Sequence, residues 1–234
     1  MVHLARAVIA LATLASGALA APPVHRVRPD LHIDLGNGLY VYNWTGVSDN
    51  HVEFEPRSDG FSSRFAYKPT EPSYLSDFAV GVGWSKGTER SIKFSGNVES
   101  IDGLIDVSVY GWINNLSGWS VEYWVREYSS EPFPGDDPGQ GVLLGTVESD
   151  GSVYDIWQWL HVALPDVDPS ADPTRKQIYF VRRENRPEGG TVTMANHFQA
   201  LRDLNVTIGE LNDQVLVTEG WRATGSSDYT VSEV

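Results

Sequence analysis

Runs in which apolar and polar residues alternate recur along most of this chain, and they predict β-strands. In "DFAVGVGW" (77–84), every second residue from Phe78 to Trp84 is large and apolar, while the residues between them are small or acidic. Side chains on a strand alternate between its two faces, so we expect one face of this run to be buried. The run "LIDVSVYGW" (104–112) alternates in the same way.

Gly, Asn and Asp cluster at short intervals between these runs, as in "RSDG", "SGN", "IDG", "SDGS" and "PEGG". Many short strands separated by such turns are typical of a β-sandwich or a jelly roll. The segment "TMANHFQALRDLN" has helical spacing instead, with Met194, Phe198 and Leu201 at i, i+4 and i+7. We therefore expect an all-β protein with a single short helix, which has Thr193 as its N-cap and packs outside a sheet.

The first twenty residues have the features of a secretory signal peptide. Arg6 precedes an apolar run over 7–15, and the small residues Ala18 and Ala20 follow it. This run is too short to span a bilayer, so we expect cleavage after Ala20 rather than a membrane anchor. The sequence therefore predicts a signal peptide over 1–20, a short tail over 21–30, and one domain over 31–234 that is secreted and extracellular.

Composition narrows the classes of partner. The chain has 31 Asp and Glu against 17 Lys and Arg, with a formal net charge of −14, which argues against nucleic acid and anionic membranes. A neutral ligand is compatible with this charge. There is no cysteine, so the domain must be held by its core and its sheet hydrogen bonds. Three Asn-X-Ser/Thr sequons, at Asn43, Asn115 and Asn205, are compatible with glycosylation in a secretory pathway.

Two glutamates stand beside tryptophans in strand-like runs. In "WSVEYWVREYSS" (119–130), alternation places Glu122, Trp124 and Arg126 on one face, and in "VLVTEGW" (215–221) Glu219 precedes Trp221 by two residues. Hydrolysis of a glycosidic bond needs one carboxylic acid to protonate the leaving oxygen and one carboxylate to attack or to activate water. From pattern alone, the pair could be catalytic or could be two solvated surface side chains. There is no Cys/His cluster and no phosphate-binding glycine loop, so we expect neither a metal nor a cofactor.

Several motifs, taken in order, resemble the endo-1,4-β-xylanases of glycoside hydrolase family 11. They are "DFAVGVGW", "SVYGW", "VEYWV", "GTVESDGSVYDIW", "RPEGGTVTMANHF" and "LVTEGW", and the resemblance runs from about Gly36 to the C-terminus. It implies a β-jelly roll of two strongly curved antiparallel sheets with one helix, forming a single catalytic domain. It also implies a retaining hydrolase of xylan that needs no cofactor or metal, and we expect it to be a monomer.

The same resemblance implies roles for individual residues. Glu122 matches the nucleophile, Glu219 the general acid/base, and Tyr110 the tyrosine that hydrogen-bonds the nucleophile and the sugar. Asp77 falls where the family has Asn or Asp beside the acid/base. The expected substrate-binding residues are Trp44, Trp124, Gln177, Pro165 and Trp221.

This chain departs from the family pattern at several positions. Trp124 replaces a tyrosine whose hydroxyl helps to bind the sugar, so we expect weaker substrate binding than is usual in the family. Asp106 and Asp213 fall where cleft tyrosines are common, Trp221 replaces a tyrosine, and the thumb tip that contains Pro165 lies in a longer acidic loop. These departures leave open an endo-hydrolase of a related β-1,4-glycan, or a glycan-binding or decoy protein without turnover.

Asp77 carries an expectation about pH. Asp at this position goes with acidic optima in the family, so we expect an acidic optimum that Asp77→Asn moves upward. The physical reason is that two carboxyls in hydrogen-bond contact share a proton and titrate as a coupled pair.

Overall fold

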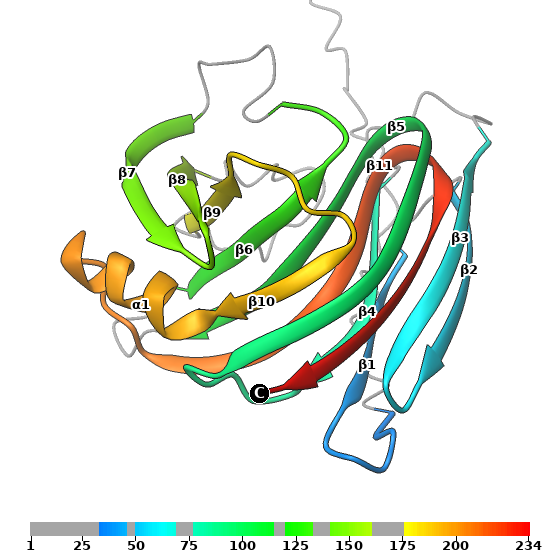
Figure 1. Ribbon diagram of the computed structural model, residues 1–234, viewed down its shortest axis with the longest axis horizontal. Helices are drawn as coiled ribbons and strands as arrows, with labels where there is room; N and C mark the ends of the chain where they lie inside the picture. Colours follow the sequence, from blue (N-terminus) through cyan, green and yellow to red (C-terminus); the bar gives the residue numbers. More distant parts are fainter. Residues whose placement is uncertain (1–32, 46–49, 69–76, 115–119, 133–140, 161–175) are drawn as a thin grey trace, which may run out of the picture.

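The structure is a computed structural model, and it describes residues 33–45, 50–68, 77–114, 120–132, 141–160 and 176–234. Most of this part of the chain is β-strand (Figure 1). The elements are β1 (Tyr40–Trp44), β2 (Asn50–Arg57), β3 (Gly60–Tyr67), β4 (Asp77–Trp84), β5 (Ser91–Asn114), β6 (Ser120–Ser129), β7 (Gly141–Ser149), β8 (Ser152–Leu160), β9 (Lys176–Arg182), β10 (Gly189–Thr193), α1 (Met194–Asp203) and β11 (Glu210–Glu233). The predicted all-β class with one helix is confirmed for the described residues.

The strands form an open sheet whose main path runs β1-β4-β11-β5-β6-β9-β8-β7. β10 joins the path at β5, β3 joins it at β11, and β2 pairs with β3. All strand pairs are antiparallel except β6 and β9, which are parallel. The chain leaves β6 for the outer strand β7 and folds back inward through β8 to β9, and this return is what places two parallel strands side by side.

Two long strands connect the two layers of the fold. β5 and β11 are 24 residues each, and they pair with one another over nearly their whole length. The first half of β11 also pairs with β4, and its second half pairs with β3. The two curved sheets expected from the sequence are therefore present, and β5 and β11 belong to both of them (Figure 1).

The ribbon bends where Gly103 of β5 faces Arg222 of β11. Both residues have positive φ, 76° for Gly103 and 49° for Arg222, and the register shifts between Trp221 and Thr224. A Cβ on Gly103 would lie 2.2 Å from the carbonyl oxygen of Arg222, so glycine is required for the two backbones to meet here. The turns predicted at "SGN" and "IDG" are wrong, because β5 continues through both segments. The hydrogen-bond ladder with β11 outweighs the local turn preference.

The main hydrophobic core lies between the layers, as alternation predicts. Val107 and Val109 of β5 and Tyr123 and Val125 of β6 are buried there. Each fully buried side chain of this size contributes about 1.5–3 kcal/mol relative to an exposed one. The opposite face of the sheet formed by β1, β4, β11, β5, β6 and β9 is covered by rings, and we call it the aromatic face. Its residues are Tyr40, Tyr42, Tyr110 and Trp124, with Trp44, Trp112 and Tyr179 packed against them.

Helix α1 begins at the predicted position, but its start is held in an unexpected way. Thr193 occupies the N-cap position without a side-chain capping bond. Its hydroxyl and its amide donate instead to the carboxylate of Asp150, at 2.7 and 2.8 Å. Asp150 and Gly151 form the turn between β7 and β8, with φ of 51° and 78°. No helix in the described part of the chain is long and apolar enough to cross a membrane.

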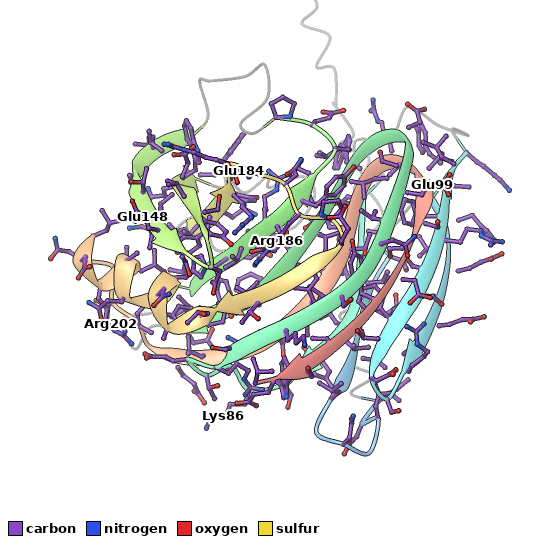
Figure 2. The ribbon with its side chains drawn as sticks, in the orientation of Figure 1. Lys86, Glu99, Glu148, Glu184, Arg186 and Arg202 are labelled. Carbon is purple, nitrogen blue, oxygen red and sulfur yellow. The ribbon has the colours of Figure 1, made fainter. Side chains whose placement is uncertain are left out.

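A second group of polar side chains is buried away from the aromatic face. Glu127 is fully buried, accepts a hydrogen bond from the Tyr154 hydroxyl at 2.8 Å and forms an ion pair with Arg186. The Arg186 side chain is 17% exposed and lies near the middle of the view in Figure 2, whereas the exposed Lys86 lies at its lower edge. Burial raises the pKa of Glu127, and the neighbouring Arg186 opposes that effect. This group is structural, because each charge is matched within it.

Candidate active site

The two glutamates singled out in the sequence lie on the aromatic face. Val121, Tyr123 and Val125 of β6 enter the main core, so Glu122 and Trp124 point the other way, as predicted. Glu219 of β11 lies between Ala79 of β4 and Asp106 of β5 in the sheet register. β5 lies between β6, which carries Glu122, and β11, which carries Glu219, and it pairs with both strands.

The carboxylate of Glu122 is held by a donor on each oxygen. The Tyr110 hydroxyl donates to Oε1 at 2.7 Å, and the Gln177 amide donates to Oε2 at 3.0 Å. The Trp112 indole in turn donates to the Tyr110 hydroxyl at 2.7 Å. Glu122 is 4% exposed, so these donors replace the water that would otherwise solvate it. The arrangement fixes one orientation of the carboxylate.

Glu219 is surrounded by acids and by apolar rings. Burial raises its pKa from 4.5 to about 8, and the charges of Asp106, Asp77 and Glu122 act in the same direction. A hydrogen bond from the Trp124 indole to Oε2, at 2.7 Å, opposes this rise. The Glu219 carboxyl therefore carries a proton in acidic and neutral solution, which is the form that a general acid needs.

Trp124 does more than supply a ring surface. Its ring stacks on Tyr179 with centroids 4.5 Å apart and planes 8° apart, and the centroid of Tyr110 lies 5.2 Å away. The sequence predicted the loss of a hydroxyl donor here. The indole N–H supplies a donor in its place and directs it at Glu219.

The other residues expected in the site are distributed along the same face or lie outside the described residues. Asp77 faces Trp221 in the register of β4 and β11, two positions along from the pair of Ala79 and Glu219. Trp44 is partly buried against the aromatic face, and Trp221 is 36% exposed. Pro165 lies outside the described residues.

Two of the three predicted glycosylation sites lie within the described residues. Asn43 and Asn205 are exposed, as a glycosylated side chain must be. Asn115 lies outside the described residues.

Sequence reasoning did not assign a role to one pair on this face. Arg126 donates a hydrogen bond to Asp106, and both side chains are nearly buried. Alternation already placed Arg126 on the face of Glu122, and Asp106 was noted as an unusual residue for its position. What the sequence could not show is that the two side chains meet across β5 and β6.

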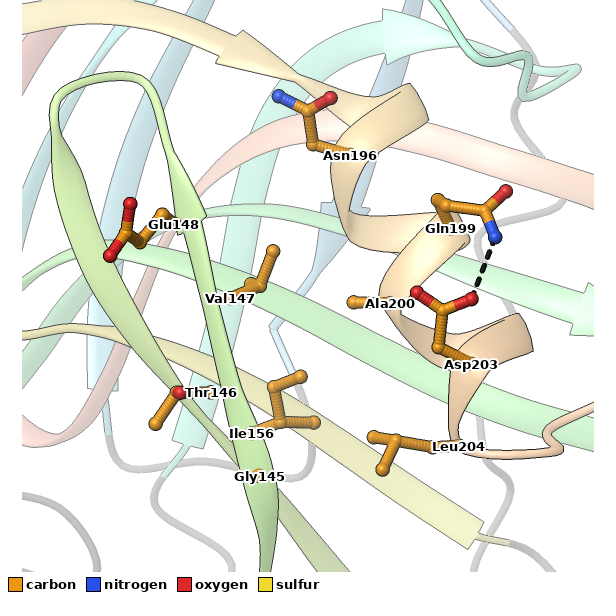
Figure 3. Close-up of a pocket in the computed structure, with 10 residues that line it drawn as sticks. All are labelled: Gly145, Thr146, Val147, Glu148, Ile156, Asn196, Gln199, Ala200, Asp203 and Leu204. Carbon is orange, nitrogen blue, oxygen red and sulfur yellow. Dashed lines mark hydrogen bonds between the residues drawn. The ribbon is translucent and has the colours of Figure 1, made fainter.

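The described residues also contain a pocket outside the aromatic face. It lies between the β7–β8 hairpin and α1 (Figure 3), and its lining comes from β7, β8 and the helix. Gln199 donates to Asp203 at 2.8 Å along its helical side. None of the strands that carry Glu122 and Glu219 contributes to it. Among the described residues, no group of three or more His, Cys, Asp or Glu side chains is placed to hold a metal ion.

The chain is similar to known proteins along most of its length. The sequence profile of "Glycosyl hydrolases family 11" matches residues 36–230. The chain is 36% identical over 191 residues to "Endo-1,4-beta-xylanase 1" of Hypocrea jecorina, covering 82% of this chain and 76% of that protein. It is 33% identical to "Probable endo-1,4-beta-xylanase B" of Aspergillus clavatus over 240 residues, covering 99% of this chain and all (100%) of that protein.

The chain is also similar to a solved structure in both fold and sequence. It comes from a study titled as a structural comparison of two major endo-1,4-beta-xylanases from "Trichodrema reesei". The TM-score is 0.67 with 35% sequence identity, covering 82% of this chain and 97% of the other.

Proposed function

The chain belongs to the glycosyl hydrolases of family 11 and is a glycoside hydrolase, and from this premise we propose that it is a secreted, retaining endo-1,4-β-xylanase. The observation that carries the proposal is the contrast between its two glutamates. Glu122 has a donor on each carboxylate oxygen, while the pKa of Glu219 is raised to about 8. One carboxylate is thus prepared to attack, and one carboxylic acid is prepared to give a proton.

In the first step, Glu122 attacks the anomeric carbon of a xylose unit while Glu219 protonates the departing glycosidic oxygen. The bond to the leaving chain breaks, and a covalent glycosyl-enzyme ester with Glu122 forms. In the second step, the ionised Glu219 removes a proton from water as the water attacks the same carbon, and Glu122 leaves as a carboxylate. Two inversions give net retention, which requires the two carboxyls to stand about 5–5.5 Å apart.

The aromatic face supplies the surroundings for such a substrate. The rings of Trp44 and Trp221 offer surfaces on which sugar rings can stack, and Gln177 lies beside Glu122. Trp124, which is 5% exposed, is proposed from the resemblance to line the same site. Pro165 is proposed, from the resemblance alone, to contact the substrate from the thumb. The acidic character of the chain fits a neutral polysaccharide, and the Arg6-containing N-terminal segment supports secretion.

A related β-1,4-glycan is the second candidate substrate, because three positions of the aromatic face differ from the family pattern. Asp106 and Asp213 bring carboxylates, and Trp124 brings an indole. A binding or decoy protein is a weaker proposal, because binding alone requires neither the donors held on Glu122 nor the raised pKa of Glu219.

Purified protein incubated with xylan and, separately, with carboxymethylcellulose tests these proposals by the release of reducing ends. We expect release from xylan. Glu219→Gln should lower turnover roughly 10²- to 10⁴-fold, the usual contribution of a general acid, and Glu122→Gln at least as much. Glu148→Gln, an exposed residue on β7, is the matched control. Activity on carboxymethylcellulose alone would favour the second substrate, and an inverted anomeric product would contradict the mechanism.

A further inference from the structure

We propose that Asp106 and Arg126 are a positioning pair for the acid/base carboxyl, in which Arg126 keeps Asp106 ionised so that the proton in this part of the site resides on Glu219. This inference rests on the proposed function of Glu219 as the acid/base. It concerns two residues that do not take part in bond breaking.

The register of the sheet places the pair beside Glu219. Asp106 of β5 stands directly opposite Glu219 of β11, on the same face of the sheet. Arg126 comes from β6, where it faces Ser108, and its Nη2 donates to Asp106 Oδ2. The same nitrogen donates to the Ser129 hydroxyl at 3.3 Å. The two side chains are 10% and 4% exposed, so water screens their charges weakly.

The other titratable groups near Glu219 come from β1, β4, β6 and β9, and none of them supplies the positive charge that Arg126 does. Asp77 of β4 and Glu122 of β6 add negative charge. Tyr42 of β1 and Tyr179 of β9 are neutral at ordinary pH, because burial raises the pKa of each phenol above its usual range. Arg126 therefore brings positive charge into a set of groups that are otherwise acidic or neutral. Its guanidinium carbon lies 5.9 Å from the centroid of the Tyr179 ring.

Two facing carboxyls in a buried site share a proton, and it can reside on either. Only a proton on Glu219 is useful, because Glu219 faces the leaving oxygen in the proposed reaction. An arginine in contact with one member favours the charged form of that member. Arg126 contacts Asp106, so the proton is left to Glu219. The second oxygen of Asp106, Oδ1, is buried and receives no hydrogen bond from the described residues, so its charge is compensated mainly by Arg126.

The decisive experiment is a titration of the Glu219 carboxyl carbon by ¹³C NMR in the full-length protein without substrate. Glu219→Gln assigns the resonance. In Asp106→Asn the facing negative charge is gone, so we expect the Glu219 midpoint to fall by at least about one pH unit, the lower end of the usual effect of a charge within about 4–6 Å. In Arg126→Met the proton is shared, so we expect a two-step titration whose last step lies above the wild-type midpoint.

The double variant and an unrelated pair complete the design. Asp106→Asn combined with Arg126→Met should give a midpoint between those of the single variants. The control is the exposed ion pair of Arg57 on β2 and Asp228 on β11, in which Nη2 and Oδ1 are 2.7 Å apart. Arg57→Met with Asp228→Asn should leave the Glu219 titration unchanged.

Opposite shifts in the two single variants support the proposal. Shifts in the same direction, or an unchanged midpoint with only a lower melting temperature, would show that the pair is purely structural. If Arg126→Met does not fold, Asp106→Asn decides alone, and an unchanged or raised midpoint overturns the proposal. The titration needs no substrate, so a lack of xylanase activity in the wild type would refute the proposed function without affecting this result.

Discussion

At the scale of single residues, Trp124 makes two interactions that a substitution can test separately, a ring contact and a hydrogen bond. Its stacking on Tyr179 is a property of the ring, whereas its hydrogen bond to Glu219 depends on the indole N–H. Phenylalanine keeps an aromatic ring and removes the donor. In the proposed reaction, a donor that fixes the Glu219 carboxyl acts in the transition state, so its loss should appear in kcat.

We therefore expect Trp124→Phe to lower kcat on xylan roughly 10- to 100-fold with a smaller change in KM. The pKa of Glu219 should rise, because the lost hydrogen bond favours its charged form. Steady-state kinetics across pH measure both effects. Trp124→Tyr, which restores a hydroxyl, is the matched variant, and the sequence comparison predicts that it lowers KM. An unchanged kcat with a raised KM in Trp124→Phe would show that the ring serves only to bind sugar.

Asp77→Asn tests a second neighbour of Glu219. The charge of Asp77 contributes to the raised pKa of Glu219, so its removal should lower that pKa and bring the alkaline limb of the pH profile down. The family resemblance predicts that the optimum nevertheless moves up, which requires a larger upward movement of the acidic limb. A complete pH–rate profile on xylan shows both limbs. An unchanged profile would mean that Asp77 has no part in the titration.

The sequence was sufficient to bring some of these residues together. Glu122, Tyr110 and Gln177 follow from motif resemblance, and the structure places them in hydrogen-bond contact. The hydrogen bond from Trp124 to Glu219 and the pairing of Asp106 with Arg126 could not be predicted, because Trp124 and Asp106 depart from the family pattern that related the other three residues. Such contacts depend on register and twist, which alternation does not specify.

At the scale of elements, alternation predicted the strand faces and helical spacing predicted α1, but neither predicted the length of the strands. Turn residues within 95–103 predicted a break, and β5 passes through them as one strand. Gly103 allows this, because it bends the strand without ending it. A local signal cannot distinguish a turn from a bend when the deciding interaction is a partner strand more than one hundred residues away.

Gly103→Ala and Gly151→Ala form a matched pair that measures the cost of separating the β5 and β11 backbones at Gly103. Both glycines have φ near 77°, but an added Cβ meets the Arg222 carbonyl only at Gly103 and meets nothing within 4 Å at Gly151. We expect Gly151→Ala to cost about 1–2 kcal/mol from backbone strain alone, and Gly103→Ala to cost clearly more. Urea unfolding measures both. Equal losses would show that β5 and β11 can separate at the bend without penalty.

At the scale of the whole molecule, Glu219 makes stability depend on pH. Its pKa rises from 4.5 to about 8 on folding, so its contribution to stability is fully present below pH 4.5 and is lost as the pH rises through 8. Each unit of this difference is worth about 1.4 kcal/mol. We expect the free energy of unfolding of the wild type to fall over this interval relative to Glu219→Gln, as measured by urea unfolding at several pH values. Parallel curves would contradict a raised pKa.

His197 acts on the opposite side of the pH range. It is a fully buried residue of α1, and neither ring nitrogen has a hydrogen-bond partner among the described residues. Burial lowers its pKa from 6.5 to about 3. Its contribution is present above pH 6.5 and is lost as the pH falls towards 3. His197→Phe keeps a ring between Tyr154 and Phe180 and removes this titration. We expect the variant to lose less stability than the wild type between pH 6.5 and 3 in the same unfolding measurement.

The long ribbon of β5 and β11 also has a consequence for the order of synthesis. β11 is made after every other described strand, yet it lies between β4 and β5 in one layer and pairs with β3 in the other. Until residues 210–233 have left the ribosome, β3, β4 and β5 lack the strand that joins them. Until then, the edges of β3, β4 and β5 that pair with β11 are open to pairing with other chains. A premature stop before β11 should yield an aggregating product rather than a smaller working enzyme.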